Sequence, residues 1–323
     1  MPLSIFMTKR VLRVGALASF LLLAGCGDSD SDEEESMGGF QIVTGLPTVQ
    51  ALGAVWSFGP SDVWVTADGG KVLHFDGEAW TPTQLGTQEM MLGIWAFAPD
   101  DVWMVGGVTL AQYDGATWTV TDLSEQEAGI EGLSAIWGSS PTYVWVVGTQ
   151  STAAHWDGSS WHRYIAAGTD NAAVWGSGPS DVFVSGTFDL AHWDGSAWET
   201  VEVDELYGSS EGIWGSGPDD VWVASGSDRV ARFDGSTWTT YELDTVAEAS
   251  ALWGRAADDI WGVGTPGGIL HYDGSAWNEV AHQKIGSPYL RVFHGVHGSE
   301  QGDVWIVGTE LGEQAAVPQL YRR

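Results

Sequence analysis

Residues 212–243 read GIWGSGPDDVWVASGSDRVARFDGSTWTTYEL, a stretch in which short apolar runs alternate with clusters of Gly, Pro, Asp and Ser. The runs 211–216, 221–225, 230–233 and 236–243 each have the alternation and the β-branched or aromatic content of a strand. Pro218 fixes φ in the first turn, and Asp234-Gly235 supplies the positive φ that a two-residue hairpin demands. The stretch therefore predicts one sheet of four antiparallel strands.

The same pattern recurs seven times along the chain. One column of the aligned copies holds Trp56, Trp95, Trp137, Trp175, Trp214, Trp253 and His297. A second aromatic follows eight residues later in every copy, namely Trp64, Trp103, Trp145, Phe183, Trp222, Trp261 and Trp305. Repeats of about 40 residues with four strands each are typical of propeller blades. We therefore expect an all-β, seven-bladed β-propeller of four-stranded antiparallel blades.

The seventh copy ends at VPQLYRR (317–323), before its fourth strand. The segment GGFQIV (38–43) precedes the first copy, and its Phe40 lies 16 residues before Trp56, the spacing at which a fourth-strand tryptophan normally precedes the next blade. We expect a strand at about residues 39–44 to complete the C-terminal blade, because this pairing closes the ring and removes two exposed sheet edges. The alternative is a six-bladed ring with an unused end.

Composition agrees with this class and excludes one kind of partner. The 323 residues are 44% hydrophobic and include 44 glycines and 20 tryptophans, which favours a large all-β core. The formal net charge is -31, and the part beyond residue 25 has nine Lys and Arg against 43 Asp and Glu. Such a surface repels nucleic acid and anionic lipid headgroups.

The N-terminus has the pattern of a bacterial lipoprotein signal. Lys9, Arg10 and Arg13 are followed by an apolar run too short to span a membrane, and then by Leu-Ala-Gly-Cys at residues 23–26. This ending matches the lipobox, so we expect residues 1–25 to be a signal peptide and Cys26, the only cysteine, to be diacylated. An ordinary signal peptide is the alternative. The acidic run that follows predicts a disordered tether over 26–38, ahead of a propeller over 39–323.

These features predict the cellular location of the protein. A lipid on Cys26, palmitate among its chains, would anchor the protein in the membrane of the bacterial cell envelope. Gly27 follows the cysteine in place of the aspartate associated with inner-membrane retention, which favours the outer membrane, at its periplasmic or surface face. We expect a monomer on this anchor.

The repeated polar residues are interpreted as structural. One aspartate per copy recurs at the same turn, so these carboxyls are spread around a ring and cannot form a catalytic pair: Asp76, Asp114, Asp157, Asp194, Asp234 and Asp273. One histidine at most precedes that turn in each copy, which is too few ligands for a metal site on any blade: His74, His155, His192 and His271. We therefore expect no metal and no cofactor.

Binding is expected where the copies diverge, in the loops of the face that joins fourth to first strands and second to third strands. The insertion before the seventh copy carries a cluster of basic and aromatic residues, the candidate partner-binding set: His282, Lys284, Tyr289, Arg291, His294 and His297. His294 and His297 are three apart in a predicted strand, so alternation places them on opposite faces. An enlarged loop over 310–319 is expected on the same face.

The repeats also resemble a family. FDGSTW (233–238) and YDGSAW (272–277) are similar to the Asp-box or BNR-like motif of sialidases and related bacterial propeller repeats. This resemblance implies a β-propeller. The predicted function is a non-catalytic binding or scaffold module for a protein or glycan partner. The alternative is a carbohydrate-active enzyme, sialidase-like or another glycosidase or lyase, and a purely structural envelope lipoprotein is a third possibility.

Overall fold

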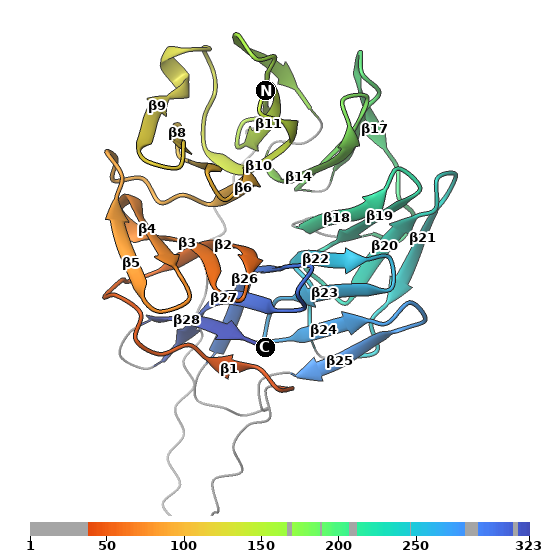
Figure 1. Cartoon of the computed structure of the whole chain (residues 1–323). Coiled ribbons are helices and arrows are strands. Elements are labelled where there is room, and N and C mark those ends of the chain that lie inside the picture. The colour runs from red at the N-terminus through yellow and green to blue at the C-terminus, as the bar shows by residue number, and fades with distance from the viewer. Residues whose placement is uncertain are drawn as a thin grey trace, which may run out of the picture. The chain divides into compact units, whose positions relative to one another are not determined.

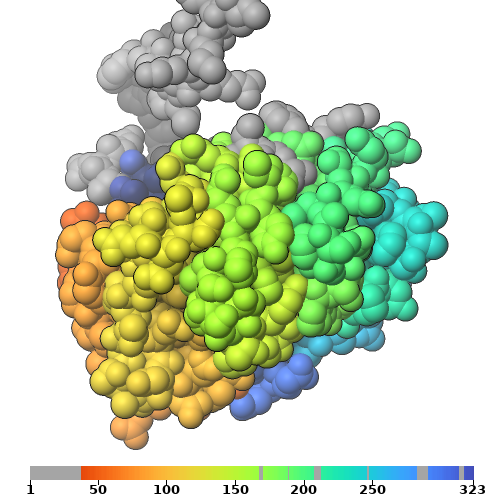
Figure 2. All heavy atoms as spheres, turned by 90° about the horizontal axis from the view of Figure 1, so that it is seen from above, coloured from red at the N-terminus to blue at the C-terminus, as the bar shows by residue number. Residues whose placement is uncertain are grey.

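The computed structural model describes residues 38–166, 170–187, 189–206, 212–245, 247–281, 290–312 and 316–323. They form seven four-stranded antiparallel sheets arranged around a central axis (Figure 1). From above, successive blades lie side by side in chain order, from orange through yellow and green to cyan (Figure 2). The predicted seven-bladed propeller is confirmed. Within these residues no helix has the length and apolar character needed to cross a membrane.

Six of the blades are continuous in sequence, each with its first strand nearest the axis. Blades 1 to 3 consist of β2 Leu52–Gly59, β3 Asp62–Ala67, β4 Lys71–Phe75 and β5 Trp80–Gln84; β6 Gly93–Ala98, β7 Asp101–Gly106, β8 Thr109–Tyr113 and β9 Trp118–Asp122; and β10 Leu133–Ser140, β11 Tyr143–Gly148, β12 Thr152–Trp156 and β13 Trp161–Ile165. Blades 4 to 6 consist of β14 Asn171–Gly178, β15 Asp181–Gly186, β16 Leu190–Trp193 and β17 Trp198–Val201; β18 Gly212–Gly217, β19 Asp220–Ala224, β20 Arg229–Phe233 and β21 Trp238–Glu242; and β22 Ala251–Ala256, β23 Asp259–Val263, β24 Ile269–Tyr272 and β25 Trp277–Ala281. Two short 3-10 turns, η1 Asp68–Gly70 and η2 Leu123–Glu125, are the helical elements of the described chain.

The turn between the third and fourth strands is longer than the sequence suggested. In blade 5 Phe233 pairs with Trp238, so the loop has four residues rather than two. The carboxylate of Asp234 accepts the backbone N–H groups of Ser236 and Thr237 at 2.9 and 2.8 Å, and Gly235 has φ +89°. The prediction that these aspartates are turn residues is confirmed, because the side chain replaces strand hydrogen bonds within the loop.

Adjacent blades are joined by aromatic contacts. In most blades the buried second-strand aromatic meets the fourth-strand tryptophan of the next blade, as in Trp145 with Trp198 and Trp222 with Trp277, at centroid distances of 5.1 and 5.6 Å. Such rings bury about 150–250 Å² each, so they dominate the packing between sheets. Most of the regularly spaced tryptophans are therefore structural, as predicted.

The ring closes through the N-terminal strand. Blade 7 contains β26 Leu290–Gly298, β27 Val304–Leu311 and β28 Ala316–Arg322, and β1 Gln41–Ile42 is its fourth strand. Gln41 pairs with Arg322 and Ile42 with Tyr321, and the N–H of Val43 donates to the carbonyl of Leu320 at 2.8 Å. The predicted closure is confirmed.

Blade 7 also differs from the expectation in the segment that connects its second and third strands. The described part of 310–319 is mostly strand and not an enlarged loop, because Glu310 pairs with Val317 and Leu311 with Ala316 across β27 and β28. Leu290 pairs in turn with Leu311 in β26. The three strands are therefore longer than those of most other blades, and strand pairing continues through most of the segment that sequence divergence alone marked as irregular.

Candidate binding site

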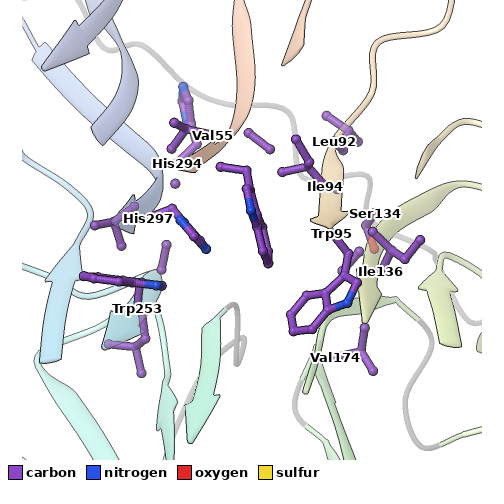
Figure 3. A pocket seen from close by; sticks show the side chains of 18 of the residues that line it. Val55, Leu92, Ile94, Trp95, Ser134, Ile136, Val174, Trp253, His294 and His297 are labelled. Carbon is purple, nitrogen blue, oxygen red and sulfur yellow. The ribbon is translucent and has the colours of Figure 1, made fainter. Parts of the chain in front are cut away.

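The first strands of all seven blades surround a central channel of about 400 Å³. Figure 3 shows side chains from separate blades facing this space, among them Trp95 of β6, Ile136 of β10, Trp253 of β22 and His297 of β26. Among the described residues, no carboxylate and no Lys or Arg lines the channel. The propeller therefore positions a mostly apolar, aromatic cavity on its axis, which is a typical composition for a ligand pocket.

The aromatic residues of the first aligned column, one from each blade, are arranged around the axis of the propeller. Trp56 meets Trp95 edge-to-face at 5.1 Å, and Trp95 meets Trp137 at 6.2 Å. A Cβ added at Gly215 or Gly254 would lie 2.6 or 2.7 Å from the indole of the preceding blade. The Trp-Gly pairs of the sequence therefore have a steric origin, since each indole lies over the backbone of the next blade.

His297 takes the tryptophan position in blade 7 and contacts blade 1. Its ring stacks on Trp56 at 4.1 Å and lies 5.4 Å from Trp253. Its Nδ1 accepts the backbone N–H of Ser57 at 3.1 Å, which leaves Nε2 as the protonated nitrogen of a neutral ring. Burial lowers the pKa of His297 to about 3, so it is uncharged near neutral pH.

Beside the channel lies a second cavity of about 450 Å³, here called the mouth pocket, whose lining includes several hydroxyl and amide side chains. It is lined by Ser134, Thr149, Asp170, Asn171, Ala172, Thr187, Ser250, Thr265, Val292, Phe293 and His294. Asn171 is 2% exposed, and its Nδ2 donates to the carbonyl of Thr152 at 3.0 Å. Its Oδ1 is buried and has no hydrogen-bond partner in the described structure, so a residue of the mouth-pocket lining carries an unsatisfied acceptor.

His294 belongs to both cavities, and the sequence argument about it was wrong. A register shift in β26 lies between Phe293 and Gly295, so a β-bulge inserts one residue and changes the alternation. His294 and His297 both line the channel, together with Gly295 and Val296 between them, so simple alternation does not separate the two histidines. Nε2 of His294 lies 3.0 Å from Oγ1 of Thr309, and the surrounding protein lowers the pKa of His294.

The predicted basic and aromatic cluster is only partly placed. His282, Lys284 and Tyr289 lie outside the described residues, as do Cys26, the predicted signal peptide and the predicted tether except for Gly38. Nε of Arg291 lies 3.0 Å from Oε2 of Glu310 across β26 and β27, so that ion pair ties two strands of the blade together. Of the described candidates, His294 and His297 line the channel and Arg291 lines neither cavity.

A set of aspartates at the start of the second strands has a structural role that the sequence reading missed. Asp62, Asp181 and Asp259 accept hydrogen bonds from His74, His192 and His271 at 2.7–2.8 Å, and Asp220 is paired with Arg232 at 2.7 Å. The joint recurrence of this aspartate and a third-strand histidine, twelve or eleven residues later, was the available signal. These polar groups stabilise the blades and do not line the channel.

Blade 3 departs from that pairing. Tyr143 stands where the aspartate is expected, and its ring packs on His155 at 4.1 Å. Nε2 of His155 is buried without a hydrogen-bond partner in the described chain, and burial lowers the pKa of His155 to about 4. Across the described ranges no group of three or more His, Cys, Asp or Glu is arranged to hold a metal ion.

The fold and the channel define the molecule as a seven-bladed β-propeller with a central cavity. No protein-family model and no curated protein matches the chain. Among solved structures it is similar to a streptogramin B lyase at 14% identity, covering 89% of this chain and 98% of that one, with a TM-score of 0.72. It is similar to YCF48 bound to D1 peptide at 14% identity, covering 88% and 96%, with a TM-score of 0.65. The WD40 propeller domain of Doa1 matches at 12% identity, covering 88% and 96%, with a TM-score of 0.68. At these identities the likeness shows the fold alone.

Proposed function

We propose that this protein is a non-catalytic binding module that holds a protein partner at the mouth pocket and channel. The observation that carries the proposal is the composition of the two cavities, in which Asp170 is the one carboxylate among the described lining residues. Glycosidases need two carboxyl groups flanking the bond that is cleaved. The described lining instead offers apolar surface with several hydroxyl and amide groups, which suits recognition of an extended polypeptide.

The solved propellers support a protein partner over a glycan. YCF48 is bound to a D1 peptide, which shows that a propeller of this size can hold a polypeptide. The streptogramin B lyase has the same fold, so we retain a carbohydrate-active enzyme, either a lyase or a glycosidase, as the alternative function. That alternative requires turnover that depends on one carboxylate, and Asp170 is the candidate that the cavities provide.

We also propose the cellular setting. The lipobox ending at Cys26 and the acidic run after it support a lipid anchor in the bacterial envelope, and Gly27 favours the outer membrane. We propose as well that the repeats containing FDGSTW and YDGSAW are related to Asp-box repeats. A rigid ring held by lipid is suited to retaining a partner near the membrane without chemistry.

The test is chemical crosslinking of the full-length protein in its native envelope, followed by identification of the captured partner. Ala172 lines both cavities, so Ala172→Trp should block them, whereas Ala116 lies in an exposed turn between the third and fourth strands of blade 2 and Ala116→Trp should not. We expect the same partner with wild type and Ala116→Trp and its loss with Ala172→Trp, at equal melting temperature. Retention of the partner by Ala172→Trp would exclude this site.

A further inference from the structure

Exposed carboxylates lie in the connections that lead into the strands lining the cavities. Glu89, Glu131 and Glu248 each lie three residues before a residue that lines the channel, in the connections that lead into blades 2, 3 and 6, and Asp170 lies in the mouth pocket itself. Within the described ranges none of the four forms an ion pair with Lys or Arg. Burial and the neighbouring Asp228 carboxylate raise the pKa of Glu248.

The cavities themselves offer acceptors and aromatic faces but no positive charge. No Lys or Arg lines either cavity in the described structure, and the lowered pKa values of His294 and His297 keep both rings neutral near pH 7. The buried Oδ1 of Asn171 lacks a donor. A cation entering this region therefore meets no repulsion, and it would supply the hydrogen bond that Asn171 lacks.

The tryptophan side chains around the channel would also attract a cation. Indole faces attract ammonium and guanidinium groups, and desolvation strengthens the effect. The net charge of -31 also steers cationic segments toward the protein and repels anionic ones. Three independent features thus favour one kind of occupant: exposed carboxylates, an unsatisfied acceptor and aromatic walls.

We propose that the partner presents a basic extended segment, and that one Lys or Arg side chain of this segment enters the mouth pocket beside Asp170 and Asn171, where a small rotation of the Asn171 amide lets its Oδ1 accept from the incoming cation. The aliphatic stem of that side chain then lies toward the aromatic channel, while the exposed carboxylates hold neighbouring basic residues of the segment. This inference rests on the proposed binding function and names the chemistry of its partner.

The test uses the full-length protein and capped peptides of equal length that differ at a single central position: lysine, arginine, norleucine, citrulline or glutamate. Binding is measured by isothermal titration calorimetry and by quenching of the channel tryptophans. We expect the lysine and arginine peptides to bind at least about tenfold more tightly than the norleucine and citrulline peptides, and the glutamate peptide not to bind. Asp170→Asn and Asn171→Leu should each remove most of that preference.

Asp100→Asn is the matched control, because Asp100 is exposed in the turn between the first and second strands of blade 2, outside both cavities. It removes the same unit of charge and should leave the lysine preference unchanged. Equal affinities for lysine and norleucine peptides would overturn the inference, as would equal losses in Asp170→Asn and Asp100→Asn, which would indicate only long-range attraction. If the crosslinked partner is lost in Ala172→Trp while the peptides show no basic preference, the binding function stands and this inference fails. Failure of the binding function itself appears separately, as a partner captured equally by Ala172→Trp.

Discussion

Phe40 packs edge-to-face on Trp261 at a centroid distance of 5.5 Å, although the two residues are more than 200 positions apart in the chain. In the other blades a tryptophan of the fourth strand occupies this place against the second-strand aromatic of the preceding blade. Phe40 is therefore the blade-7 equivalent of those tryptophans, and it carries the closing contact of the ring.

Removing that contact should open the ring. Phe40 is 6% exposed, so Phe40→Ala is expected to cost about 3–5 kcal/mol in the free energy of unfolding, measured by urea denaturation. Ile42, two residues further along in β1, is 52% exposed, and Ile42→Ala should change the free energy of unfolding by less than about 0.5 kcal/mol. Deletion of residues 40–44 should lower the melting temperature sharply, and an unchanged value would contradict closure by this strand.

Among the acidic residues, substitution of the aspartates that begin the second strands should destabilise the fold most. Asp220 is 5% exposed and accepts hydrogen bonds from Ser216 at 2.6 Å, Trp222 at 3.0 Å and Arg232 at 2.7 Å. Asp220→Ala leaves the Arg232 guanidinium without its partner and should cost about 3–5 kcal/mol of unfolding free energy. The adjacent exposed Asp219 is the control, and comparable losses at both positions would argue against this role.

His155 should make the fold sensitive to acid. Its pKa is about 4 in the folded protein, while a histidine in the unfolded chain titrates near 6.5. As the pH falls, the unfolded chain therefore protonates this histidine at a higher pH than the folded protein does. The contribution of neutral His155 to the free energy of unfolding is fully present above about pH 6.5 and is lost between pH 6.5 and about 4.

Replacing this ring should reduce that loss. We expect His155→Phe to have a melting temperature close to wild type at pH 7 and above wild type at pH 5, measured by thermal denaturation followed by circular dichroism. His74→Phe breaks the 2.8 Å bond to Asp62 and should lower the melting temperature at pH 7. An identical pH dependence in wild type and His155→Phe would refute the assignment.

His297 and Ser57 should be energetically coupled. The smaller ring at position 297 is found opposite Ser57, where most other blades have glycine beneath tryptophan. His297→Trp should cost about 1–3 kcal/mol by overpacking, and Ser57→Gly should restore part of that loss. A double-mutant cycle measures the coupling, for which we expect about 0.5–3 kcal/mol, and strict additivity of the two changes would contradict it.

Much of the fold follows from repetition in the sequence. The two aromatic columns and the turn residues predict the number of blades, the four strands of each and the closing strand, because every copy repeats the same local signals. The length of the turn after Phe233 was mispredicted, since Asp234 binds backbone N–H groups through its side chain and so lengthens the loop. The segment 310–319 was mispredicted for a different reason: loss of the repeat pattern was taken for loss of strand pairing.

The candidate site was less predictable. His294 was identified as a candidate, but the bulge beside it interrupts the alternation, and Gly295 was the one local signal for that bulge. Asn171 and the hydroxyl groups of the mouth pocket come from several blades and carry no shared motif. Their proximity depends on the diameter of the closed ring.

The sequence by itself determined the seven blades, the register of their aromatic columns and the need for an N-terminal strand, because these depend on local alternation and on the pairing of sheet edges. The tertiary structure alone decided which side chains face the axis and where an acceptor is left unsatisfied. Those properties arise when seven first strands meet around one channel, so that each side chain is positioned by contacts with neighbouring blades as well as by its own strand.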